Sequence, residues 1–188
     1  MKILIVAMGR TGSTNLMRCL SETLNLELIA EPFNTHFWRD LEKREPTYKE
    51  GDPIPDNCVF KTMIDHNPKW LNKNVKNFSH VIVLVRANIR ELCISGVNAT
   101  KYGYYHEYEP TEFPYINNFV HESKKYKKLF QFAAFHPKSK LVFYEDLYNK
   151  SSSIVENTVR WMNLGITKEQ FNEMRDGYLS PSKRLRKI

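Results

Sequence analysis

Residues 2–20 read KILIVAMGRTGSTNLMRCL, and this stretch decides the fold. An apolar run over residues 3–8 gives way to a short loop of Gly, Ser and Thr, and apolar residues then recur at helical spacing over residues 14–24. The pattern predicts a buried strand, a tight loop and an amphipathic helix, in that order.

The loop GRTGST at residues 9–14, called the glycine loop below, has the composition of an anion-binding turn. Gly9 and Gly12 let the backbone turn tightly enough for its N–H groups to converge. Ser13 and Thr14 add hydroxyls at the positive end of the helix dipole, where a phosphate or sulfate is stabilised. In the simpler alternative, the two hydroxyls only cap the helix.

The ATP-binding Walker A loop, G-x-x-x-x-G-K-[ST], fits this sequence poorly. Aligning Gly12 and Thr14 with it places Ala7 at the first glycine and Ser13 at the lysine. Arg10 still supplies a cation within the loop. The sequence therefore predicts an anion site in which Arg10 supplies the positive charge that the lysine supplies in a Walker A loop.

The composition predicts one globular domain over residues 1–188, with 41% hydrophobic and 26% charged residues. A net charge of +7 favours an acidic partner such as a nucleotide, although runs of lysine are also typical of solvated surfaces. Three cysteines without CxxC spacing suggest neither a disulfide framework nor a zinc site. We therefore expect a soluble cytoplasmic protein, with no membrane-spanning segment.

Apolar, β-branched runs alternate with helical patterns along the chain. The expected strands cover residues 3–8, 58–63, 80–85 and 140–144, and residues 26–30 form a further strand or a loop. The expected helices cover residues 14–24, 88–99, 115–135 and 153–164, with another around 35–44. This alternation predicts a three-layer α/β/α fold around a central parallel sheet.

Arg86 ends the predicted strand 80–85, and Ser95 follows within the next helix. An arginine at the carboxyl end of a central strand and a helical serine facing it are able to hold one anion. Alternatively, the arginine forms a salt bridge at the strand end and the serine packs between helices.

The last predicted strand runs into Tyr144, Glu145 and Asp146. In one interpretation Asp146 holds a metal ion, as a Walker B aspartate does. In the other, the acids brace the loop by hydrogen bonds and Tyr144 packs on a flat ligand ring.

Together, GRTGST at 9–14, VRANIRELCIS at 85–95 and YEDL at 144–147 resemble the motifs of the sulfotransferase family, whose donor is 3′-phosphoadenylyl sulfate (PAPS). The resemblance extends in the family's order over residues 1–165, and it is strongest to bacterial sulfotransferases with an R-[ST]-G-S-T loop. It implies a fold like that of P-loop NTPases, PAPS as the donor and no metal.

The resemblance also implies residue roles. The residues that would hold the 5′ phosphate and the sulfate are Arg10, Thr11, Gly12, Ser13 and Thr14. Arg86 and Ser95 would hold the 3′ phosphate, Tyr144 would lie near the adenosine, and Lys183 in the basic stretch 182–184 would close over the phosphates.

The catalytic residues that the resemblance implies are Arg10, which stabilises the leaving group, and a base. Glu31 is the first candidate for the base, because a glutamate follows the first helix in the bacterial enzymes. His66 is the second and His36 the third. Lys61 would contact the sulfate or the acceptor.

The acceptor is expected to be a hydroxyl or amine of a small molecule or carbohydrate, and not a nucleic acid. An aromatic cluster, Tyr102, Tyr104, Tyr105, His106 and Tyr108, has flat rings that suit such an acceptor or simply pack together. The alternatives are a P-loop kinase or nucleotide phosphotransferase, and a non-enzymatic nucleic-acid-binding protein. The sequence leaves the acceptor and the oligomeric state open.

Overall fold

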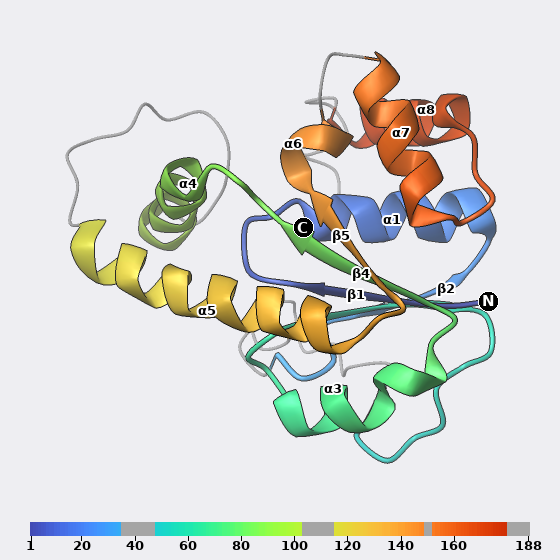
Figure 1. Ribbon diagram of the computed structural model, residues 1–188, viewed down its shortest axis with the longest axis horizontal. Helices are drawn as coiled ribbons and strands as arrows, with labels where there is room; N and C mark the ends of the chain where they lie inside the picture. Colours follow the sequence, from blue (N-terminus) through green and yellow to red (C-terminus); the bar gives the residue numbers. More distant parts are fainter. Residues whose placement is uncertain (35–47, 103–114, 149–151, 180–188) are drawn as a thin grey trace.

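A computed structural model describes residues 1–34, 48–102, 115–148 and 152–179. In this part of the chain, five strands form one sheet in the order β2-β3-β1-β4-β5, and every neighbouring pair is parallel (Figure 1). The strands are β1 (Lys2–Ala7), β2 (Glu27–Ala30), β3 (Cys58–Met63), β4 (His80–Val85) and β5 (Ser139–Phe143). The predicted parallel sheet is therefore confirmed.

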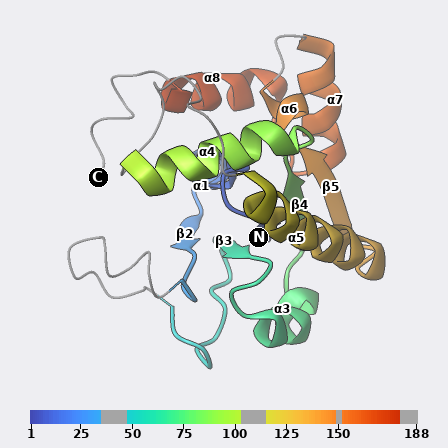
Figure 2. The same cartoon turned by 90° about the vertical axis from the view of Figure 1, so that its left-hand side faces the viewer.

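The carboxyl ends of the strands meet at one edge of the sheet. Ala7 pairs with Met63 on one side and with Leu84 on the other, so β1, β3 and β4 end almost level. The glycine loop, Glu31, Arg86 and Tyr144 follow β1, β2, β4 and β5 and therefore leave the sheet at this edge. Figure 2 looks onto it and shows α4 (Ile89–Tyr102) crossing in front. Ligands of open parallel sheets bind at this kind of edge.

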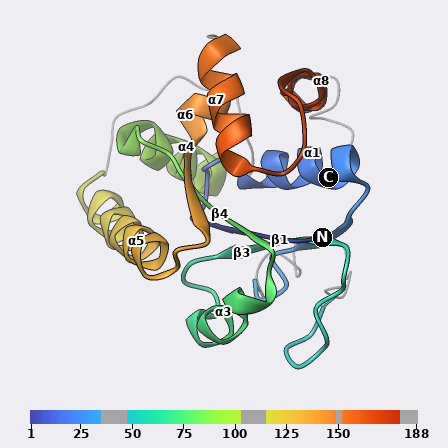
Figure 3. The same ribbon diagram turned by 45° about the vertical axis from the view of Figure 1, so that its right-hand side comes forward.

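Helices cover both faces of the sheet (Figure 3). One core joins Ile3 and Ile5 of β1 to α1 (Ser13–Leu24), α7 (Ser152–Met162) and α8 (Lys168–Leu179). The other joins Leu4 and Val6 to α3 (Pro68–Asn74) and α5 (Tyr115–Phe135). Burial of β1 on both faces explains its uninterrupted apolar run, which differs from the alternation of a half-exposed strand.

The predicted elements differ from the observed ones mainly at their ends. The run 26–30 contains strand β2, and the predicted strand 140–144 is shifted by one residue, because Tyr144 already begins the short helix α6 (Tyr144–Leu147). Helices α3 and α8 and the 3₁₀ turn η1 (Val75–Asn77) were not predicted. The helix expected around 35–44 lies outside the described residues.

Both missed helices carry local start signals. Asn67 caps α3 by accepting a hydrogen bond from the Trp70 N–H at 3.0 Å, and Pro68 occupies the first helical position. At the start of α8, Thr167 and Gln170 exchange hydrogen bonds between side chain and backbone. No described helix is both long enough and apolar enough to cross a membrane.

Candidate functional site

The glycine loop turns through two left-handed residues, Arg10 with φ 65° and Gly12 with φ 75°. Gly12 is the N-cap of α1, and no side chain of the described residues caps the helix there. Thr11 is buried and donates its hydroxyl to the Met8 carbonyl at 2.9 Å. The capping role considered for Ser13 and Thr14 is thus not observed, and the first N–H groups of α1 face the loop without a side-chain acceptor.

Glycine is required at position 12 for two reasons: its backbone is left-handed, and the Tyr144 ring lies too close to leave room for a side chain. A Cβ built at this position would lie 2.7 Å from Cδ2 and Cε2 of Tyr144. The Tyr144 ring stacks on Tyr148 with centroids 4.4 Å apart, and the guanidinium carbon of Arg86 lies 4.8 Å from the Tyr144 centroid. The Tyr144 ring therefore contacts both the glycine loop and Arg86 at the end of β4.

Arg86 and Arg10 lie together at the sheet edge. Nη1 of Arg86 donates to the Arg10 carbonyl at 3.5 Å, and Nη2 pairs with Glu91 at 2.7 Å. Arg86 Nε is buried and finds no hydrogen-bond partner in the described chain. Ser95 accepts a hydrogen bond from Nε of Arg10 at 2.9 Å. The glycine loop and the β4 end thus lie side by side at one sheet edge, and Ser95, which is predicted to hold the same anion as Arg86, contacts Arg10.

Glu145 braces the segment after Arg86. Its carboxylate accepts hydrogen bonds from the N–H groups of Ala87 at 2.9 Å and Asn88 at 3.1 Å. Of the two interpretations of the YEDL motif, bracing is therefore the one observed for Glu145. Asp146 belongs to no group of three or more potential metal-ligating acids, histidines or cysteines among the described residues.

A buried ion pair connects three segments beside the glycine loop. Lys61 and Glu31 form a salt bridge, with side chains only 2% and 6% exposed. Lys61 Nζ also donates to the Thr14 hydroxyl at 2.7 Å, and Asn34 donates to the other Glu31 oxygen at 2.8 Å. This arrangement places the candidate base next to the predicted anion site.

Burial and the charges of the two partners set the pKa values of Glu31 and Lys61. Burial raises the pKa of Glu31, but the Lys61 ammonium and the hydrogen bonds from Lys61 and Asn34 outweigh it, so the pKa lies below its usual value. Burial lowers the pKa of Lys61, and the pairing with Glu31 offsets this only in part. Glu31 is therefore ionised at neutral pH, as a proton acceptor must be.

His66 follows β3 and is the second candidate base. Burial lowers its pKa, although Glu31 and Asp65 act in the opposite direction. Its Nδ1 is buried and has no hydrogen-bond partner in the ranges described. His66 is accordingly neutral at physiological pH and has a free ring nitrogen.

The lowered pKa of His66 predicts that acidification destabilises the protein. The folded protein takes up its proton at lower pH than the unfolded chain does, so this contribution is complete above about pH 6.5 and is lost as the pH falls through the folded pKa. We expect His66→Gln to lose less stability than the wild type between about pH 7 and pH 5. Urea unfolding measured across this range tests it, and parallel pH profiles of the two proteins would contradict it.

Several predicted residues lie outside the described residues or lack a described side chain. His36, Lys183, Tyr104, Tyr105, His106 and Tyr108 are outside, and Tyr102 ends α4 with no described side chain. Sequence reasoning missed Asn34, Glu91 and the contact between Lys61 and Thr14. The available signal for that contact was Lys61 itself, because a lysine within a strand predicted to be buried needs a polar or charged partner.

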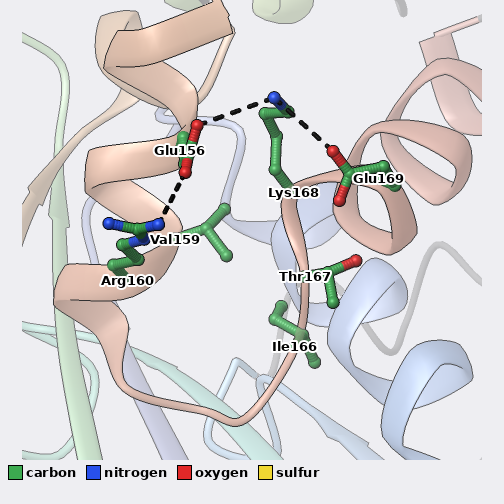
Figure 4. A pocket seen from close by; sticks show the side chains of 7 residues that line it. All are labelled: Glu156, Val159, Arg160, Ile166, Thr167, Lys168 and Glu169. Carbon is green, nitrogen blue, oxygen red and sulfur yellow. Dashed lines mark ion pairs between the residues drawn. The ribbon is translucent and has the colours of Figure 1, made fainter.

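A separate hollow of about 290 Å³ lies between α7 and α8 (Figure 4). Glu156 pairs there with Arg160 at 2.8 Å and with Lys168 at 3.6 Å. Its lining includes none of the predicted site residues. The hollow is therefore not part of the candidate site.

No family model and no curated protein matches the sequence. The structure is similar to retinol dehydratase in complex with androsterone and the inactive cofactor PAP (TM-score 0.58) and in complex with retinol and PAP (TM-score 0.59). It is also similar to mouse sulfotransferase SULT7A1 complexed with PAP (TM-score 0.57). Each alignment has 12% sequence identity and covers 97% of this chain and 65% of the other.

These neighbours define the class of fold. The chain has the α/β fold of these PAP-bound proteins, one of which is a sulfotransferase. It spans about two thirds of the length of these neighbours.

Proposed function

We propose that the chain is a PAPS-dependent sulfotransferase, which transfers a sulfuryl group to a hydroxyl or amine of a small-molecule or carbohydrate acceptor. The observation that carries the proposal is the meeting of the glycine loop with Arg86 at one sheet edge, where Nη1 of Arg86 lies 3.5 Å from the Arg10 carbonyl. The fold shared with PAP-bound sulfotransferases supports it.

The residues at this edge fit a donor with anionic groups at both ends. Arg86 has a buried Nε without a partner in the described chain, as expected of a guanidinium that binds a ligand. The N-terminus of α1 has no side-chain cap from the described residues, and it favours a second anion. In our proposal Arg10 and residues 11–14 hold the 5′ phosphate and sulfate, Arg86 and Ser95 hold the 3′ phosphate, and Tyr144 lies near the adenosine.

The transfer is an in-line displacement. The acceptor oxygen or nitrogen bonds to sulfur, the bond from sulfur to the 5′-phosphate oxygen breaks, that oxygen keeps the electron pair, and the acceptor proton passes to Glu31. Arg10 and the N–H groups at the start of α1 stabilise the charge on the leaving phosphate. Proton uptake by Glu31 removes the negative charge that Lys61 pairs with. The Lys61 ammonium then stabilises charge on the group in transfer.

Calorimetry distinguishes this function from the alternatives. We expect 3′-phosphoadenosine 5′-phosphate (PAP) to bind without Mg²⁺ and more tightly than adenosine 5′-phosphate, which lacks the 3′ phosphate. Preference for ATP with Mg²⁺ would favour the phosphotransferase. Steeply salt-dependent binding of RNA or DNA that PAPS does not affect would favour the nucleic-acid-binding protein. A screen of acceptors with radiolabelled donor then tests transfer itself.

Arg86→Ala is expected to weaken PAP binding by about 1.5–3 kcal/mol, because charge-assisted hydrogen bonds to the 3′ phosphate are lost. The matched control is Arg90→Ala, which removes the same charge from an exposed position on α4 and should leave the affinity unchanged. Calorimetric titration measures both. Equal affinities of wild type and Arg86→Ala would refute the role of Arg86.

A further inference from the structure

The guanidinium that the proposed function assigns to the 3′ phosphate already has a carboxylate partner. Nη2 of Arg86 pairs with Oε2 of Glu91, on the first turn of α4, at 2.7 Å. We propose that Glu91 is an internal competitor for this anion subsite: it holds Arg86 when no ligand is bound, and a phosphate displaces it. The inference rests on the proposed function and adds a residue that sets the affinity for the 3′ phosphate.

Glu91 satisfies Arg86 incompletely. Nε and Nη2 lie along one edge of the guanidinium, and an anion with several oxygens is able to bind both at once. Glu91 takes only Nη2, and Nε remains buried with no acceptor in the described part of the chain. A phosphate at this edge therefore makes a contact that Glu91 does not make.

Arg86 does not depend on Glu91 for its orientation. Its guanidinium carbon lies 4.8 Å from the centroid of the Tyr144 ring, and Nη1 approaches the Arg10 carbonyl at 3.5 Å. These two contacts come from β5–α6 and from the glycine loop, so they persist when the glutamate leaves. Removal of Glu91 should therefore leave Arg86 in place, as expected of a competitor. Removal of a positioning residue would instead misplace the arginine.

The glutamate is also free to leave. The Glu91 side chain is 57% exposed, whereas that of Arg86 is 16% exposed. The Glu91 backbone N–H is held by the Asn88 side chain at 3.1 Å, so only the side chain has to turn into solvent. An exposed ion pair is weak, and repulsion between the carboxylate and an incoming phosphate favours the exchange.

Calorimetry of Glu91→Gln with PAP and adenosine 5′-phosphate tests the competition. We expect PAP to bind about two- to fivefold more tightly than to the wild type, the range that an exposed ion pair supports, with adenosine 5′-phosphate unchanged. The control Glu173→Gln removes the same charge from the exposed surface of α8 and should change neither affinity. Unchanged or weaker PAP binding by Glu91→Gln would overturn the proposal.

Inorganic phosphate provides a readout that does not require the proposed function. We expect phosphate to raise the Tm of Glu91→Gln more than that of the wild type, and the double variant Arg86→Ala/Glu91→Gln to lose this gain. If the wild type does not bind PAP, the proposed function fails. The changes in Tm that inorganic phosphate causes then test whether Glu91 competes for the anion subsite. Equal shifts in wild type and Glu91→Gln would then overturn the inference.

Discussion

Replacement of Lys61 by methionine is expected to lower the free energy of unfolding by about 3–5 kcal/mol, because it leaves the buried Glu31 carboxylate without its cation. Methionine matches the length of the aliphatic part of lysine but carries no charge and no donor for Thr14. Urea unfolding of wild type and variant at pH 7 measures the loss.

Two variants show whether charge causes this loss. Lys61→Met combined with Glu31→Leu removes both charges and should recover much of the stability, because an apolar pair needs no counterion. Lys2→Met breaks the Lys2–Asp56 pair, whose aspartate is 94% exposed, and should cost at most about 1 kcal/mol. A double variant as unstable as Lys61→Met would mean that packing around Lys61, not its charge, is responsible.

Glu31→Gln is expected to slow sulfuryl transfer by about 10²–10⁴-fold while PAP binds as before. Glutamine keeps one oxygen that accepts the hydrogen bond from Lys61, but its NH2 group replaces the oxygen that accepts from Asn34, and it does not take up the acceptor proton. Radiolabelled PAPS and an acceptor from the screen give the rate, and calorimetry gives the affinity.

Two further variants assign the base. Glu27→Gln removes a carboxylate from the exposed edge strand β2 and should transfer at the wild-type rate. His66→Gln should retain most of the activity if Glu31 is the base. A fully active Glu31→Gln together with an impaired His66→Gln would reassign the base to His66.

The sheet and the glycine loop were predictable because their signals are local. Long apolar runs mark strands that are buried on both faces, and Gly12 between a strand and a helix marks a tight turn. Helices α3 and α8 were missed although their caps at Asn67 and Thr167 are also local. Helix α3 is short and α8 has few apolar residues, so both give little periodicity and their caps are the strongest signal.

The candidate site was predictable only in part because its contacts cross the sheet. The glycine loop and the β4 end lie at one edge because each follows a parallel strand, and the resemblance had assigned both to one donor. The contact of Lys61 with both Thr14 and Glu31 depends on β3 lying between β2 and β1, an order that the sequence does not encode locally. The pairing of Glu91 with Arg86 similarly depends on where α4 begins.

The Tyr144 ring fills the space that a side chain at position 12 would need, which makes the two positions epistatic. The steric clash at position 12 is relieved only after Tyr144 has become smaller, although a larger residue still strains the left-handed backbone there, and that earlier change removes the ring against which Arg86 stacks. If position 12 changes first, the new side chain clashes with the Tyr144 ring. Mutational paths away from this pair therefore pass through an impaired intermediate in either direction, so we expect the two residues to be inherited together.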